Sequence, residues 1–374
     1  MSEHSAGVRP GNETELVEIL SAPGTAYELV AGGTKRGIGR PVDAALLDLS
    51  ALSGVVDYQP GELVLTVRPA TPLRQIETLL RGHNQRLGFE PPMPALLDAA
   101  GEQSLGGVLM ANSSGSRRIT AGSARDHFIG FRAVNGRGEA FVGGGRVVKN
   151  VTGFDLPKVL AGSWGTLAAL TEVTVRVVPA AESETTLLFA VDGAQAAVEL
   201  CAAALGSTFE VSSAAFVPAR GVALRLEGLV ASVQTRIAAL LAALARSPQE
   251  LLEATASRAL WREVGAAAAL ARFPVIWRLS VPPKQAARIL AAIDAEEFQL
   301  DWGGGLIWVG AQRVDAARIR GALQGGHATL VRASPAERRS NAVFEPQAPA
   351  IATLAARFKA AFDPHERLNP GRMN

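Results

Sequence analysis

Four glycines within eight residues, set among two basic side chains, are the first feature of this 374-residue chain that could do chemistry. They occur at residues 29–41, LVAGGTKRGIGRP, beside Lys35 and Arg36. Glycine allows backbone amides to turn toward a ligand without a side chain in the way, and two cations beside such a turn favour an anion. On this stretch alone, an anion-binding loop and a surface turn after a strand stay equally open.

Two further clusters of small residues follow. GEQSLGGVLMANSSGSRRITAGSARD, residues 101–126, opens a short apolar segment with Ser104 and closes it with Asn112 and its neighbours. Small side chains there would let backbone amides and hydroxyls approach a phosphate or a planar ring system. The alternative is a loop that is rich in small residues only because they pack well. In the third cluster, residues 143–177, the rigid Trp164 stands between two glycines directly before a strand, which is unusual for a simple turn.

Known signatures of other enzyme classes are missing from these loops. The nicotinamide fingerprint G-x-G-x-x-G does not occur at residues 31–40, and the Walker loop, the G-x-S-x-G elbow and the H-E-x-x-H pair are absent from the sequence. The sequence therefore argues against a classical NAD dehydrogenase, an NTPase, a serine hydrolase and a zinc protease.

Composition narrows the class of protein further. With 37 Lys and Arg against 35 Asp and Glu, the formal net charge is +2, which argues against nucleic-acid binding driven by phosphate neutralisation. The single cysteine, Cys201, excludes an intramolecular disulfide and a cysteine metal cluster, and a reducing compartment fits this usage. Residues 1–20 hold no basic segment followed by an apolar core, and no run approaches the length of a membrane span, so we expect a soluble protein.

The first half of the chain is predicted to hold short strands broken by glycine-rich loops. A strand-loop-helix unit is expected at residues 61–85, because a β-branched run is followed by TPLRQIETLLRGHNQ, whose apolar residues share one helical face. The NGRG stretch at residues 135–138 predicts a hairpin. Further strands are expected at residues 27–32, 46–50, 128–134, 139–144 and 171–179.

From about residue 181, alanine-rich amphipathic helices alternate with strands. This pattern predicts a separate α+β domain in which helices cover an antiparallel sheet. A final helix at residues 348–362 would place Ile351, Leu354, Ala355, Phe358 and Phe362 on one stripe. The other helices are expected at 193–206, 233–246, 256–271, 284–295 and 313–323, and the strands at 185–191, 221–227, 275–281, 305–310 and 328–332.

The ordered set of these stretches resembles a known family. The stretches are AGGTKRGIG, PATPLRQIE, the segment from GEQSLGG to VNGRGE, KNVTGFDLPKVLAGSWGTLAALTEVTV and the terminal LNPG. Together they resemble the FAD-binding domain of the vanillyl-alcohol oxidase and p-cresol methylhydroxylase (PCMH) superfamily of flavoproteins. Within that superfamily they resemble the FAD-binding E subunits of glycolate oxidase, over nearly the whole chain.

The resemblance implies an α+β fold with a two-part PCMH-type FAD-binding domain and a separate α+β cap domain. Residues 1–180 would form the FAD-binding domain, and residues 335–374 would return to complete it. Residues 181–334 would form the cap on the substrate side of the flavin ring.

The resemblance also implies which residues hold FAD. Amides of the first loop would wrap the pyrophosphate, the second loop would add contacts, the third segment would run along the adenosine side, and the C-terminal loop would return near the flavin. In chain order these residues are Gly32, Gly33, Thr34, Lys35, Gly37, Ile38, Ser104, Gly106, Gly107, Asn112, Gly115, Gly162, Gly165, Thr166, Glu172, Val173 and Asn369. No metal ligand is predicted.

Two departures from the family pattern bear on chemistry. Members that attach FAD covalently often have His in the first loop, whereas Thr34 and Lys35 follow the paired glycines here, so we expect dissociable FAD. Related catalytic 2-hydroxy-acid dehydrogenases share a C-terminal His-rich segment with a Gly-Asp-Gly-Asn core that binds substrate and removes the hydroxyl proton. This chain has no such segment.

Oxidising a 2-hydroxy acid needs a hydride acceptor, a cationic clamp for the carboxylate and a base for the hydroxyl proton. Arg146 and Lys149 are candidates for the clamp, with surface solvation the favoured role. His127 and His365 are candidates for the base, with structural or solvent-exposed roles favoured. We therefore predict no specific catalytic acid or base.

Three functions stay open at this point. The first is the FAD-binding subunit of a glycolate oxidase or dehydrogenase complex that oxidises glycolate, or a similar acid such as D-lactate, and passes electrons through FAD to partners. The second is a non-catalytic FAD-binding structural or electron-relay subunit, and the third is a stand-alone FAD oxidoreductase acting on another small substrate. The expected partners are a second FAD subunit and an iron–sulfur subunit, since one cysteine cannot hold a cluster. The expected location is cytoplasmic, or peripheral to the inner membrane through partners.

Overall fold

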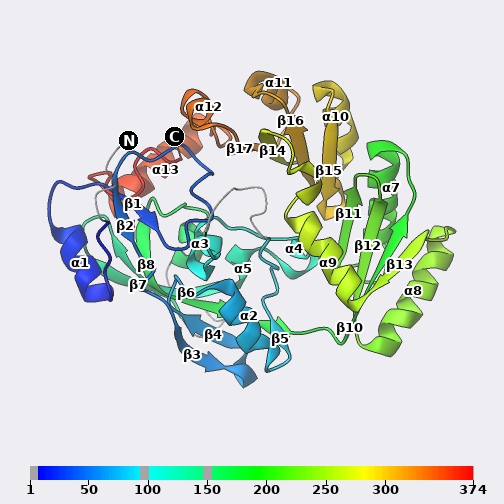
Figure 1. Cartoon of the computed structure of the whole chain (residues 1–374), viewed down its shortest axis with the longest axis horizontal. Helices are drawn as coiled ribbons and strands as arrows, with labels where there is room; N and C mark the ends of the chain where they lie inside the picture. The colour runs from blue at the N-terminus through cyan, green and yellow to red at the C-terminus, as the bar shows by residue number, and fades with distance from the viewer. Residues whose placement is uncertain (1–6, 93–100, 146–153, 374) are drawn as a thin grey trace.

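The computed structural model describes residues 7–92, 101–145 and 154–373. Its two largest sheets belong to two bodies that lie side by side, and the first and last described residues both lie in the left-hand body (Figure 1). None of the helices in these ranges combines the length and the apolar character that crossing a membrane requires. We call the two bodies the left-hand body and the right-hand body.

Five antiparallel strands form the main sheet of the left-hand body. The NGRG stretch joins two of them as predicted, and Val134 pairs with Ala140 beside the turn. Side chains such as Ile76, Leu109 and Val173 are buried between this sheet and short helices. Across the sheet the strands are β3 (Val55–Gln59), β4 (Val64–Val67), β8 (Ala168–Arg176), β6 (Phe128–Asn135) and β7 (Ala140–Gly144), and the helices are α2 (Leu73–Arg81), α3 (Leu105–Met110), α4 (Arg118–Ala121), α5 (Ala124–His127) and α6 (Leu156–Leu160).

The C-terminal segment packs against the first strand of the chain. Asn369 donates its main-chain N–H to the carbonyl oxygen of Tyr27 at 2.9 Å, and Leu368 is buried beside Leu16 and Leu20. The chain ends are therefore held together on the left-hand body. The elements here are α1 (Glu13–Ser21), the parallel pair β1 (Tyr27–Val30) and β2 (Ala45–Asp48), the antiparallel pair β5 (Gln85–Arg86) and β9 (Val178–Pro179), α12 (Pro335–Ser340) and α13 (Pro349–Phe362).

Eight antiparallel strands form the sheet of the right-hand body. Helices α7 (Gly193–Leu205), α8 (Val230–Leu244), α10 (Ala286–Ile293) and α11 (Ala316–Gly321) cover one face, where Leu224, Trp277 and Ile289 are buried. Helix α9 (Ala254–Gly265) packs on the other face near one end. In order across the sheet the strands are β13 (Glu250–Glu253), β10 (Ser183–Phe189), β12 (Gly221–Gly228), β11 (Ser213–Val217), β15 (Glu297–Asp301), β16 (Leu306–Ala311), β14 (Val275–Ser280) and β17 (His327–Arg332).

The predicted α+β class, with helices on an antiparallel sheet, is confirmed. The five helices and five strands predicted between residues 181 and 334 are present, with ends shifted by a few residues. Strands β11, β13 and β15 were not predicted, because SAAFV, ELLE and EFQLD are short and lack a clear β-branched alternation. Neighbouring strands rather than local propensity hold them in the sheet.

Two apolar stripes seen in the sequence have different environments. Trp302, Leu306, Ile307 and Trp308 could form either an interface or the core by sequence, with the core favoured, and all four are less than a tenth exposed. On α13, by contrast, Ile351, Leu354 and Phe358 remain exposed. Only Phe362, at the end of the stripe, packs against another ring, that of Phe141 at 5.6 Å between ring centres.

A set of charged side chains joins the two bodies. Arg225 donates two hydrogen bonds of 2.8 Å to the Glu90 carboxylate, and Arg117 donates to Glu227 at 2.7 and 2.9 Å. Although burial acts to raise it, the neighbouring guanidinium groups hold the pKa of Glu227 well below its usual range. We call this set the interdomain charge cluster; it comprises Arg86, Glu90 and Arg117 of the left-hand body and Glu184, Arg225 and Glu227 of the right-hand body.

Candidate functional site

A first cavity of about 120 Å³ lies in the left-hand body, between the glycine-rich loop that follows β1 and helix α3. The two loops touch directly at its edge, because a Cβ added at Gly32 would lie 1.7 Å from the main-chain oxygen of Glu102. Gly33 has a φ of 70°, which a residue with a side chain rarely adopts. Glycine at both positions is therefore what lets the loops close around this cavity.

The loop presents free hydrogen-bond donors to the first cavity. Within the part of the chain that the structure describes, the main-chain N–H groups of Gly32, Gly33, Thr34 and Lys35 donate to no protein acceptor. All four residues line the cavity. Successive unpaired amides of this kind form an anion-binding nest, so the anion-binding interpretation of the loop is the one that the geometry favours.

Lys35 adds a positive charge at the point where this cavity meets a second one. Its Nζ donates to Oε1 of Gln103 at 2.6 Å, and the side chain lines both cavities. Burial lowers the pKa of Lys35 to about 7. A nearby anion would stabilise the charged ammonium form.

The second cavity, of about 410 Å³, lies between the two bodies. Its left-hand wall includes Asn112, Gly115 and Arg118, and its right-hand wall includes Arg278 and Asp301. Trp164 and Lys35 line both cavities, which are therefore adjacent. The volume falls in the ordinary range for small-molecule sites, which is about 300–1,000 Å³.

The structure brings thirteen of the seventeen predicted site residues to these two cavities. The residues at the first cavity are Gly32, Gly33, Thr34, Lys35, Ser104, Gly106, Gly107, Gly165 and Asn369. Those at the second cavity, besides Lys35, are Ile38, Asn112, Gly115 and Gly162. Gly37, Thr166, Glu172 and Val173 line neither.

Strand β8 explains why the last predicted positions lie outside. Its residues from Ala168 to Leu170 line the first cavity, and the strand then runs on into the sheet. Val173 is fully buried in the core, while Glu172 points to the opposite face and lies across from Arg132. Thr166 donates its hydroxyl hydrogen to the carbonyl of Ser163 and stabilises the preceding turn.

Asn369 holds the edge of the first cavity in place. Its side-chain oxygen accepts a hydrogen bond from the N–H of Leu29 at 2.8 Å, and its Nδ2 donates to the carbonyl of Trp164 at 2.8 Å. The unusual backbone at Trp164, with a φ of 54°, is thus tied to β1 through the C-terminal loop. Asn369 lies near the cavity as predicted, with its amide group already occupied by protein partners.

The candidate bases His127 and His365 do not line either cavity. His127 is buried and both ring nitrogens face main-chain carbonyls, those of Ala121 at 2.8 Å and Arg176 at 3.2 Å, which is the structural role favoured from the sequence. His365 is exposed and lines neither cavity. Arg146 and Lys149 lie outside the described residues.

Sequence reasoning missed the charged groups of the second cavity. These are Arg118, Arg278, Asp301 and His327. One signal was present, because Arg278 interrupts the apolar strand VIWRLSV on the face opposite Val275 and Trp277. Nothing in the sequence indicates that this face would adjoin a cavity shared with the left-hand body instead of facing bulk solvent.

Comparison with known proteins identifies the family. The model of a family described as "FAD binding domain" matches residues 5–144. The glycolate oxidase subunit GlcE of Escherichia coli is 31% identical over 96% of this chain and 95% of its own length. The chain belongs to the GlcE family of glycolate oxidase subunits. The match extends through both bodies and the C-terminal return.

More distant relatives are similar to only about half of this chain. The glycolate oxidase subunit GlcD of Bacillus subtilis is 28% identical over 52% of this chain and 41% of its own length, and a D-lactate dehydrogenase of Archaeoglobus fulgidus is 27% identical over 50% and 41%. Among solved structures, a xylooligosaccharide oxidase from Myceliophthora thermophila has a TM-score of 0.67 at 15% identity, covering 98% of this chain and 90% of that one. At such identity the structural likeness concerns the fold alone.

These findings confirm the predicted PCMH-type FAD-binding fold, the FAD cofactor and the class of FAD-dependent oxidoreductase. The residues of the first cavity fit the cofactor, because a nest of free amides and a half-buried lysine suit a pyrophosphate. The glycines leave no side chain in the way of that contact.

The affinity for FAD is expected to fall as the pH rises from 7 to 9. In the free protein Lys35 loses its proton near pH 7, whereas a bound pyrophosphate would raise its pKa, so binding takes up a proton in this window. The dissociation constant should rise by up to about tenfold per pH unit. Titration of the apoprotein with FAD, followed by flavin fluorescence, measures this slope. In Lys35→Met the slope should be flat, and an equal slope in both proteins would contradict the assignment.

Proposed function

We propose that this chain is the FAD-binding subunit of a complex that oxidises glycolate, or a similar 2-hydroxy acid such as D-lactate, to the 2-oxo acid. The observation that carries the proposal is the pair of adjoining cavities. A run of free amides lines the first cavity, and charged groups from two bodies line the second. The first suits the pyrophosphate of a dinucleotide, and the second offers room for the flavin ring and a small polar substrate.

The chain's own residues would divide the work between the cavities. The amides of Gly32 to Lys35 would hold the pyrophosphate, while Ile38, Asn112, Gly115 and Gly162 would border the flavin ring from the left-hand body. Bound FAD supplies the acceptor for the two electrons of the oxidation. Residues 181–334 would act as the cap that closes the substrate side.

Two forms of this proposal differ in which subunit supplies the base that receives the hydroxyl proton. The second cavity holds Asp301 and His327, but the His-rich segment of related dehydrogenases is absent from the sequence. Either the chain oxidises the acid itself, or it binds FAD as a relay while a second flavoprotein subunit holds the substrate. In both forms an iron–sulfur subunit would take the electrons onward. The exposed stripe on α13 supports a subunit role, because such apolar patches are typical of contact surfaces.

Anaerobic mixing with glycolate tests the proposal. The chain is purified alone and, in parallel, co-purified with its native partners, and flavin absorbance near 450 nm is followed after the acid is added. We expect bleaching in the complex, and bleaching of the isolated chain as well if it carries the substrate site. The complex would be refuted if the native chain purified without any partner and if no 2-hydroxy acid reduced its flavin.

The cofactor is proposed to be dissociable. Thr34 and Lys35 occupy the positions after Gly33, so the first loop offers no histidine for a covalent bond. Acid precipitation of the holoprotein should leave the yellow flavin in the supernatant. Colour that remains in the pellet would show a covalent attachment at another residue. For the location, we propose the cytoplasm, with partners linking the protein to the inner membrane.

A further inference from the structure

Two arginines of the second cavity lie over the same tryptophan ring, that of Trp302. The guanidinium carbons of Arg118 and Arg278 lie 4.6 and 5.0 Å from the centre of the Trp302 ring, within the range of a cation–π interaction. Arg118 begins α4 in the left-hand body, and Arg278 lies on β14 in the right-hand body. Both line the second cavity.

The Trp302 ring is fixed by hydrogen bonds. Its Nε1 donates to the carbonyl of Gly115 at 3.0 Å, across the boundary between the bodies, and the main-chain N–H of Trp302 donates to Asp301 at 2.7 Å. Asp301 in turn accepts a hydrogen bond from Ser116 at 2.7 Å. The two guanidinium groups are therefore presented by a rigid ring at a set place in the cavity.

Neither guanidinium group is neutralised by the protein. Across the described ranges, no hydrogen bond or ion pair joins the guanidinium group of Arg118 or Arg278 to a protein acceptor. Burial, and the charge of Arg118, lower the pKa of Arg278 to about 10, so it stays protonated at neutral pH. Two like charges left without an anion in a largely buried space are costly, and an anion placed beside them would relieve that cost.

The next arginine in the sequence shows the contrast. Arg117 forms ion pairs with Glu90 and Glu227, so the protein itself balances its charge. The carboxylate that acts on Arg278 is Asp301, whose two oxygens accept hydrogen bonds from Ser116 and Trp302. The carboxylate that acts on Arg118 is Asp126, which accepts hydrogen bonds from Ser123. Arg118 and Arg278 thus keep their donors free for a ligand.

We propose that Arg118 and Arg278 together bind the carboxylate group of a small 2-hydroxy acid in the second cavity. The inference rests on the proposed function and names the part of the substrate that this chain recognises. Guanidinium groups match a carboxylate with paired, charge-assisted hydrogen bonds. The apolar side chains of Leu306, Trp308 and Val331 line the same cavity and would exclude water from the ion pairs.

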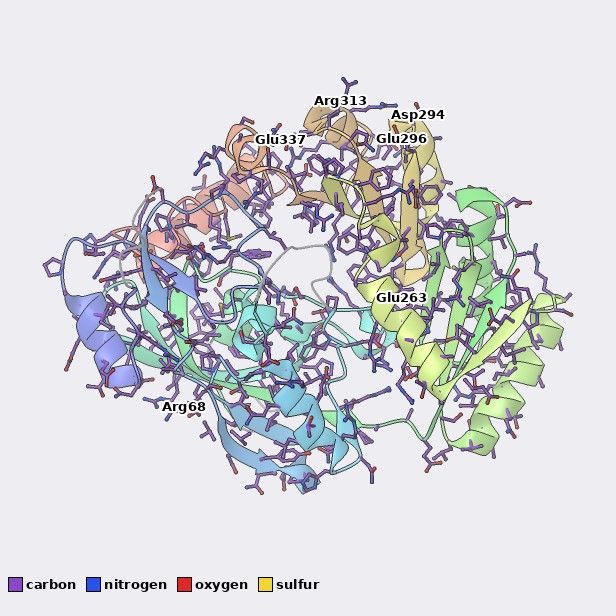
Figure 2. The ribbon with its side chains drawn as sticks, viewed as in Figure 1. Arg68, Glu263, Asp294, Glu296, Arg313 and Glu337 are labelled. Carbon is purple, nitrogen blue, oxygen red and sulfur yellow. The ribbon has the colours of Figure 1, made fainter. Side chains whose placement is uncertain are left out.

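Binding of oxamate, a small monocarboxylate that a flavin cannot oxidise, tests the clamp. It is measured by calorimetry and by the change in the flavin absorption spectrum of the FAD-loaded protein, so turnover is not needed. Arg118→Met and Arg278→Met should each weaken oxamate binding by about tenfold or more, and Arg278→Lys should recover part of the loss. Arg313→Met is the matched control, because Arg313 is exposed at the top of the right-hand body (Figure 2) and does not line the second cavity. This variant should bind oxamate as the wild type does.

The outcomes separate the clamp from the proposed function. FAD content and unfolding temperature confirm that each variant is folded. The clamp is overturned if the wild type fails to bind oxamate, or if both methionine variants bind oxamate as tightly as the wild type does. This holds even where glycolate still reduces the flavin. If the variants lose oxamate but no 2-hydroxy acid reduces the flavin in chain or complex, the clamp stands and the proposed reaction is wrong.

Discussion

Gly32→Ala is expected to yield a protein that has lost most of its FAD. The new methyl group would lie 1.7 Å from the main-chain oxygen of Glu102, so the two loops at the first cavity must separate. Overpacking of this kind costs about 1–3 kcal/mol, which corresponds to an affinity for FAD about 5- to 150-fold weaker. The ratio of flavin to protein absorbance after purification, and a titration with FAD, measure the loss.

A matched substitution separates this effect from the general cost of replacing glycine. A Cβ at Gly61 would meet nothing within 4 Å, so Gly61→Ala should keep the wild-type flavin content. Flavin retained equally by both variants would mean that the contact between the two loops does not shape the cofactor site.

Arg225→Met is expected to lower the free energy of unfolding by about 3–5 kcal/mol, because removing one partner leaves buried charges uncompensated. Arg225 is fully buried, donates to both oxygens of Glu90 and lies 4.5 Å from the centre of the Trp261 ring. Its loss would leave Glu90 with only Arg117 as an ion-pair partner among the described residues. Urea denaturation followed by circular dichroism measures the change.

Two further variants show whether the loss comes from the stranded charge. Arg220→Met removes an exposed arginine from an ion pair with Glu250 at 3.5 Å and should change stability by less than about 1 kcal/mol. Adding Glu90→Gln to Arg225→Met should recover part of the loss, since the uncompensated carboxylate is then gone. An Arg225→Met protein as stable as Arg220→Met would show that the interdomain charge cluster contributes little to stability.

Stability should also fall in acid through the same cluster. Burial acts to raise the pKa of Glu227, but Arg117 and Arg225 outweigh it and hold that pKa well below its usual range. Its contribution is therefore present above the pKa of an unfolded glutamate, near 4, and is lost as the pH falls toward the lower folded value. The cluster is therefore expected to join the two bodies more firmly at neutral pH than in acid.

Local patterns were enough to find the main elements, and the family resemblance was needed to assign the glycine-rich loops to a cofactor site. The glycine-rich loop after β1, the NGRG hairpin and the alanine-rich helices are each specified by neighbours in the chain, through backbone freedom, turn chemistry and period. The glycines of the cofactor loops are visible because no other residue type allows such close backbone approach. These features could therefore be predicted before the fold was known.

The roles of the charged residues depended on contacts between distant parts of the chain. Arg117 and Arg118 are neighbours in sequence, yet one is held by carboxylates from the right-hand body and the other faces the second cavity with no such partner. Likewise, β8 turns Val173 into the core three residues after Leu170 lines the first cavity. Whether an arginine is paired or free depends on which carboxylates the other body brings to within a few ångströms of it. The tertiary fold sets that distance, and the local sequence does not specify it.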